Sequence, residues 1–305
     1  MTAVPAFERR ETVGGVAIAT MIGLTFTWGL SNILTKIAIA GYNPVFVTLT
    51  RSALAAILVL GWCAFRGIPL FRRDGTLVPG LIVGGLFSIQ FLLLFIGLEF
   101  TSVARAVLLA NTMPFWVLIG AHFFLGEKMD GKKLAGIALA FVGVLVLFRD
   151  RLSVPGPDAW IGDLMNLAAG AVWAAITFVI KGTRLSDAVP EKVLCYQLGV
   201  SAAVSLCVLP FAGPVFRDPG MAANLAIVVQ AVFVACISYI VWFWMVRRYP
   251  AASLSSFVFL VPSFGVFQGA IFLGEPLSPW VFLSLGLIAA GILIVNRPSR
   301  TVPAV

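Results

Sequence analysis

The sequence predicts an all-α membrane protein whose ten transmembrane helices form two inverted-topology five-helix repeats. Composition is the first indication: 60% of the 305 residues are hydrophobic and only 11% are charged, whereas about a quarter of a soluble domain is charged. The second is a series of apolar segments near the roughly 20 residues needed to cross the hydrocarbon. The third is an internal repeat, in which the sequence around Pro114 returns around Pro262.

Ten apolar segments are candidate spans. Several contain Gly or Pro, which transmembrane helices tolerate when neighbouring groups satisfy the freed backbone. The fifth and tenth segments are short, so we expect them to cross with little tilt. The predicted spans are 14–38, 43–65, 77–98, 104–125, 133–148, 162–181, 190–211, 222–246, 251–273 and 279–296.

The repeat rests on two pairs of similar segments. NTMPFWVLIGAHFFLGE ends at Glu127 and FLVPSFGVFQGAIFLGE ends at Glu275, so that Glu and Pro match at the same offset of 148 residues. Upstream, WGLSNILTK, which begins at Trp28, is echoed by WAAITFVIK, which begins at Trp173. Chance similarity between apolar segments is the alternative. The shared Pro and Glu at equal spacing favour duplication.

The distribution of basic residues sets the predicted orientation. Of the 21 Lys and Arg, 15 fall on one side of the predicted membrane and five on the other, while Arg51 lies within a span. Cytoplasmic loops carry the excess of Lys and Arg, so we expect a multi-pass protein of the cell (inner) membrane with both termini cytoplasmic. Because each repeat has five spans, the second enters the membrane from the opposite side, as in many transporters.

The predicted organisation has five parts. They are a cytoplasmic N-terminal tail at 1–13, a first repeat at 14–148, an external linker at 149–161, a second repeat at 162–296 and a cytoplasmic C-terminal tail at 297–305.

Several functional classes are disfavoured. The basic residues lie mostly in short loops, so topology explains the pI near 9.7 better than nucleic-acid binding does. The four Cys form no close pairs, which indicates neither a disulfide framework nor a metal site. No P-loop pattern is present, and a single His offers little for catalysis. We therefore expect no cofactor and no enzymatic activity.

An ordered set of motifs points to a family. They are Trp-Gly at Trp28, an Arg eight residues into span two, a mid-span Pro, and a Gly-Glu that closes a helix, with the last two recurring in the second half. This pattern resembles the EamA-type ten-helix members of the drug/metabolite transporter superfamily. The resemblance implies export of amino acids and other small metabolites through a central cavity between the halves. Gln197 stands where the first repeat has Arg51, so identical substrate contacts from both halves are not expected.

Polar residues within spans are candidate solute contacts, because such side chains in hydrocarbon face protein or water. At ~1.5 Å per residue, Asn32, Arg51, Gln90 and Asn111 lie roughly 10–12 Å below the predicted outer surface. Arg51 could bind a carboxylate or phosphate through its planar fork, and Trp28, Trp173 and Trp242 would form apolar walls. The predicted substrate-binding residues are Arg51, Asn32, Gln90, Asn111, Trp28, Gln197, Tyr239 and Trp242.

Each of these assignments has a structural alternative. The amides could form interhelical hydrogen bonds worth about 1 kcal/mol each, and Arg51 could form a structural ion pair with Glu99. Pro114 and Pro262 each remove a backbone hydrogen bond near mid-span, which predicts either a hinge or a static kink. Glu127 is expected to form a surface ion pair with the neighbouring lysines, Lys128, Lys132 and Lys133.

All 13 carboxylates fall at helix ends or in loops, whereas proton-driven exporters of cations usually need an acid within the membrane. The sequence therefore favours an anionic or zwitterionic metabolite. The predicted function is a secondary transporter that exports small metabolites such as amino acids, by alternating access around a midplane cavity. The alternative is a multidrug exporter of hydrophobic compounds. The expected partners are a small-molecule substrate and the lipid bilayer, without nucleic acid, and homodimer formation is left open.

Overall fold

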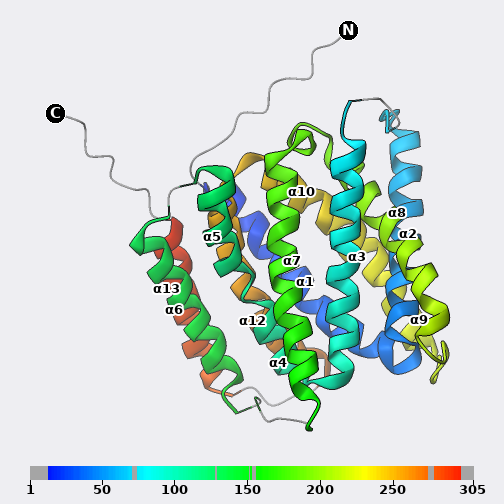
Figure 1. The fold of residues 1–305 in the computed structure, drawn as a ribbon. Helices are drawn as coiled ribbons and strands as arrows, with labels where there is room; N and C mark the ends of the chain where they lie inside the picture. The colour runs from blue at the N-terminus through cyan, green and yellow to red at the C-terminus, as the bar shows by residue number, and fades with distance from the viewer. Residues whose placement is uncertain are drawn as a thin grey trace.

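The computed structural model shows helical spans that run side by side along one direction (Figure 1). It describes residues 13–70, 74–127, 129–150, 152, 156–273 and 278–296, without the side chains of residues 272 and 273. Among these residues, nine helical segments are long and apolar enough to cross a membrane, and Trp280–Asn296 is a shorter apolar helix. The predicted all-α, ten-span architecture is confirmed. The predicted terminal tails lie outside the described residues, apart from Val13.

The first repeat supplies the first five spans. Asn43 starts the second by accepting a hydrogen bond from the backbone N–H of Val45 at 2.9 Å, next to a proline at the first helical position. Asp130 starts the fifth span in the same way, because its side chain accepts a hydrogen bond from the backbone N–H of Lys133 at 2.7 Å. The helices are α1 (Gly15–Gly41), α2 (Pro44–Phe65), α3 (Leu77–Phe100), α4 (Val103–Ala110), α5 (Met113–Leu125) and α6 (Gly131–Phe148).

The second repeat follows the same order with more irregular helices. The third span of this repeat, which is the eighth of the chain, contains a π-helical stretch, η3, which the sequence did not predict. The elements are α7 (Ala159–Gly182), η1 (Arg184–Ser186), α8 (Pro190–Val208), η2 (Leu209–Phe211), α9 (Met221–Val229), η3 (Gln230–Ser238), α10 (Tyr239–Arg248), α11 (Ala251–Ser256), η4 (Phe257–Phe259), α12 (Leu260–Leu273) and α13 (Trp280–Asn296).

Both mid-span prolines follow an interruption of their helix. The fourth span breaks at Asn111 and Thr112, and Pro114 is the second residue of α5. The ninth span tightens into the 3₁₀ segment η4 just before Pro262 in α12. We expected a bend within one continuous helix, whereas the structure has a break or a tightening directly upstream of each proline. The role of the prolines as hinges stays a prediction.

The two repeats are interleaved. Helix α1 packs mainly on α12 and α9, while α7 packs on α3, α4 and α5. The equivalent helices α2 and α8 pair with each other, as do α6 and α13. Helices α1 and α7 run in opposite directions (Figure 1), as an inverted repeat requires. Each repeat therefore depends on the other for most of its packing.

Glycines allow this close approach. A Cβ on Gly291 would lie 2.4 Å from the carbonyl oxygen of Gly136, where α13 crosses α6. A Cβ on Gly162 would lie 2.5 Å from the carbonyl oxygen of Gly97, where α7 crosses α3. Small residues are typical of transmembrane helix contacts, since association there depends on close packing.

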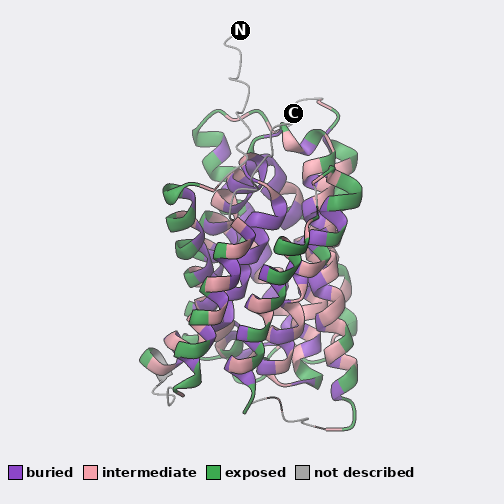
Figure 2. Ribbon diagram, turned by 90° about the vertical axis from the view of Figure 1, so that its left-hand side faces the viewer, coloured by how far each residue is buried: buried purple, intermediate pink, exposed green. Residues whose placement is uncertain are grey.

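The outward faces of the helices are apolar. Burial is concentrated between the helices, and the exposed residues lie around the outside (Figure 2). Large apolar side chains on that outside include Phe65, Phe123 and Phe124, each more than 70% exposed. Such a surface suits hydrocarbon rather than water, as expected of a multi-pass membrane protein.

The glycine contact between α6 and α13 is testable. Gly291→Ala should lower the free energy of unfolding by about 1–3 kcal/mol, because its methyl group overpacks the contact. Gly286→Ala is the matched control on the same helix, since a Cβ there meets nothing within 4 Å. That change should be neutral or stabilising by up to about 1 kcal/mol. Thermal unfolding in detergent measures both; equal effects would contradict the packing described.

Candidate functional site

A pocket with a cavity volume of about 160 Å³ lies between the two repeats. We call the end of the bundle marked by Gly15, Leu125 and Asn296 the upper end, and the end marked by Gly41 and Phe100 the lower end. The pocket runs from Trp28, in the middle of α1, to Ile39, Leu98 and Val103 near the lower end. Its walls come from α1, α3 and α4 of the first repeat and from α7, α8, α10 and neighbouring segments of the second.

Aromatic rings close the pocket toward the upper end. The Trp28 ring lies in edge contact with three others, at centroid distances of 5.7 Å from Trp173, 5.3 Å from Trp242 and 6.3 Å from Tyr239. The indole N–H of Trp28 donates to the Ser238 hydroxyl at 2.9 Å, which joins α1 to the end of η3. This hydrogen bond holds Trp28 at the centre of the four rings of Trp28, Trp173, Trp242 and Tyr239, which we call the aromatic floor.

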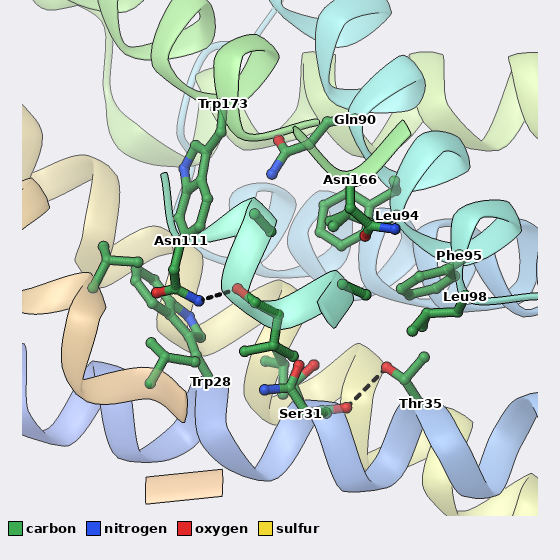
Figure 3. Close-up of a pocket in the computed structure, with 18 of the residues that line it drawn as sticks. Trp28, Ser31, Thr35, Gln90, Leu94, Phe95, Leu98, Asn111, Asn166 and Trp173 are labelled. Carbon is green, nitrogen blue, oxygen red and sulfur yellow. Dashed lines mark hydrogen bonds between the residues drawn. The ribbon is translucent and has the colours of Figure 1, made fainter. Parts of the chain in front are cut away.

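Amide side chains line the pocket between these rings and the lower end (Figure 3). Asn111 donates to the carbonyl oxygen of Val107 at 2.7 Å, and Asn166 donates to that of Gly162 at the same distance. Asn32 and Gln90 have no side-chain hydrogen bond to the described part of the protein. Their amides can therefore both donate to a solute and accept from it.

The charge that reaches the pocket comes from Lys36. Its side chain is exposed and lines the pocket near the lower end. No carboxylate is among the pocket-lining residues of the described chain, so the pocket is positively charged. Sequence analysis did not assign Lys36 to the site. The internal repeat was an available signal for Lys36, because this lysine lies eight residues after Trp28, just as Lys181 lies eight residues after Trp173.

Arg51 lies behind the pocket wall. The side chain is fully buried, and its guanidinium carbon lies 3.9 Å from the ring centroid of Phe91 and 5.8 Å from that of Phe95. Both rings line the pocket, whereas Arg51 does not. The alternative of an ion pair between Arg51 and Glu99 is wrong, since Glu99 pairs with Arg217 at the lower end.

The other predicted site residues come together. Seven of the eight line this one pocket, although whether they bind a solute stays a prediction. The seven are Trp28, Asn32, Gln90, Asn111, Gln197, Tyr239 and Trp242.

A separate cluster, the Glu127 latch, joins the repeats at the upper end. The Glu127 carboxylate accepts from the backbone N–H groups of Ala251 at 2.9 Å and Ala252 at 3.4 Å, at the start of α11. It also pairs with the Lys181 ammonium at 3.4 Å, which donates in addition to the carbonyl oxygen of Tyr249 at 2.7 Å. A carboxylate at a helix N-terminus is stabilising. The sequence predicted a pairing with neighbouring lysines and missed these contacts with the second repeat.

A multi-span helical bundle has the architecture of a membrane transporter when a largely apolar pocket with a few polar side chains lies between its inverted repeats. The model of the EamA-like transporter family matches residues 15–149 and 160–297. The chain belongs to that family and is a transporter, not an enzyme.

Curated relatives agree with this assignment. The "Probable amino-acid metabolite efflux pump" of Escherichia coli (strain K12) is 28% identical over 286 residues, covering 88% of this chain and 90% of that protein. The "Probable terminal-alkyne amino-acid exporter" of Streptantibioticus cattleyicolor is 25% identical over 288 residues, covering 92% of this chain and 93% of that protein. A crystal structure with 21% identity aligns at a TM-score of 0.79, covering 94% of this chain and 98% of that one, which shows a shared fold.

Proposed function

We propose that this chain exports small metabolites that carry a carboxylate, amino acids first, by alternating access around the pocket between its repeats. The observation that carries the proposal is the composition of the pocket: the exposed Lys36 ammonium, amide side chains and aromatic walls occur together, with no carboxylate among its described lining residues. The names of two relatives, which refer to amino-acid metabolite efflux and amino-acid export, support the same substrate class.

Each part of the pocket matches a part of such a solute. The Lys36 ammonium would attract and bind the carboxylate through a charge-assisted hydrogen bond. The amide oxygens of Asn32 and Gln90 would accept from the solute ammonium, and the indole walls would contact its apolar side chain.

Alternating access requires one end of the pocket to be closed while the other is open. Here the pocket extends to the lower end, whereas the aromatic floor and the Glu127 latch lie toward the upper end. With the predicted orientation, the lower end faces outside and the upper end faces the cytoplasm. The helix interruptions before Pro114 and Pro262 would act as the hinges between this state and its inverted counterpart.

Repeat symmetry assigns opposite states to two equivalent lysines. Lys181 is bound within the Glu127 latch at the closed end, while its counterpart Lys36 is exposed at the open end. In an inverted-repeat transporter the two halves exchange conformations. We therefore expect Lys36 to become buried when the lower end closes. A carboxylate bound to Lys36 would be enclosed in the pocket together with it.

The role of Lys36 can be tested by transport in proteoliposomes with a panel of amino acids and their amides. Lys36→Gln should raise the KM of the exported amino acid roughly 10- to 150-fold, the equivalent of a charge-assisted hydrogen bond of about 1.5–3 kcal/mol. The KM of the corresponding amide should change little. Lys132→Gln removes an exposed charge at the upper end of α6 and serves as the matched control.

Two results would contradict the proposed function. One is a wild-type protein that moves lipophilic cations but no member of the amino-acid panel, since that would favour multidrug export. The other is an equal loss of transport for the acid and the amide in Lys36→Gln, because the carboxylate would then not be the group that Lys36 recognises.

The Glu127 latch predicts a conformational bias. Glu127→Gln removes the charge that binds Lys181 and the start of α11, so the upper end should open more often. A cysteine at Ser255, a buried position in α11, should then react several-fold faster with an impermeant maleimide applied from the cytoplasmic side, in a background lacking native cysteines. Asp130→Asn is the matched control, because it removes a carboxylate at the same end that caps the first turn of its own helix. Equal reaction rates in the two variants would exclude a latch function.

A further inference from the structure

The buried guanidinium of Arg51 has no acidic partner among the residues that the structure describes. The described carboxylates that form ion pairs with residues distant in the chain pair with other cations, namely Lys192, Lys181, Arg105 and Arg217. None of the three guanidinium nitrogen atoms has a hydrogen-bond partner in the described protein. The face of Phe91 at 3.9 Å supplies cation–π attraction, but it offers no acceptor to the five N–H groups. A full charge in this position is costly unless it is paired.

Only one layer of side chains separates Arg51 from the pocket. Phe91 covers the guanidinium and lines the pocket with its neighbour rings Phe87 and Phe95, at centroid distances of 4.7 Å and 5.6 Å. The Tyr239 hydroxyl is within electrostatic reach of the guanidinium, without a hydrogen bond of normal geometry. Removing the Phe91 ring from its place would thus bring Arg51 into the pocket.

A further polar side chain without a hydrogen-bond partner in the described chain, that of Gln197, belongs to the same wall. Gln197 lines the pocket from α8, the helix that pairs with the helix of Arg51, and both polar atoms of its amide are buried without a partner. Tyr239 follows directly after η3, and a π-helical stretch is frequently found at a functional site. An anion in the place of the Phe91 ring would meet the guanidinium, the amide N–H of Gln197 and the hydroxyl of Tyr239.

We propose that Arg51, Gln197 and Tyr239 form a second, deeper subsite for the carboxylate of the solute, which becomes accessible when the Phe91 ring moves aside. This inference rests on the proposed function and extends it. Lys36 binds the carboxylate near the lower end, and the Arg51 subsite receives it further from that end. The planar guanidinium binds a carboxylate in bidentate fashion, which would restrict this subsite to solutes with that group.

A binding experiment tests the subsite without transport. Phe91→Ala opens a space beside Arg51 that sodium propionate can fill. Propionate at about 100 times its Kd should raise the unfolding midpoint of this variant by about 4 °C in a saturable manner. Propionamide and equimolar sodium chloride should not, nor should propionate act on Phe91→Ala/Arg51→Gln. If Phe91→Ala does not fold, Phe91→Leu replaces it. Equal responses to propionate and propionamide would overturn the subsite.

A transport experiment tests whether the solute uses the subsite. Arg51→Gln should lower the preference for an amino acid over its amide, measured as the ratio of their kcat/KM values, at least tenfold. Arg66→Gln is the matched control, because Arg66 is an exposed arginine at the end of the same helix that also lies over an aromatic ring, at 5.4 Å from Trp62. A preference unchanged in Arg51→Gln would contradict the proposal.

The two experiments separate the subsite from the proposed function. If the protein transports no member of the panel but its Phe91→Ala variant responds selectively to propionate, the subsite proposal stands and the proposed function fails. If the protein exports amino acids but shows neither an Arg51-dependent preference nor a propionate response, the proposed function stands and the subsite proposal fails.

Discussion

Packing between the repeats is the constraint on which the rest of this structure depends. Most helices find their main neighbours in the opposite repeat, and the glycines of α3, α6, α7 and α13 set how closely those neighbours approach. Neither repeat could bury its polar side chains or form the pocket without the other. In hydrocarbon, where apolar burial drives no association between helices, this close packing is the main source of cohesion.

Charged residues reinforce the same contact at both ends. Four of the five ion pairs in the described chain join one repeat to the other. Apart from the buried Lys192, their side chains are partly exposed, and exposed pairs contribute modestly to stability. Hydrogen bonds from Lys192 and Thr76 lower the pKa of Asp74 to about 2, so that this carboxylate stays ionised at physiological pH. The four pairs are Asp74–Lys192, Glu127–Lys181, Asp163–Arg105 and Glu99–Arg217. Because these carboxylates are held at the ends of the bundle, none reaches the pocket, whose accessible charge is that of Lys36.

Sequence analysis predicted what depends on hydropathy and spacing. It gave the ten spans, the repeat and seven residues of the pocket, because depth along a helix follows from counting residues. It could not give the direction of a side chain around its helix, since each residue turns by about 100°. Arg51 therefore shares the depth of Asn32 but lies behind Phe91. The contacts of Glu127 with α11 and the π-helical stretch η3 depend on tertiary packing, and no local pattern indicates them.

The most direct test of the account is the side from which the pocket can be reached. A cysteine at Ser31, a lining residue of α1, can be introduced into a protein without its native cysteines and labelled in intact cells with an impermeant thiol reagent. The account predicts labelling from outside the cell, and slower labelling in the presence of an exported amino acid. Labelling only from the cytoplasmic side, or labelling that no amino acid slows, would contradict it.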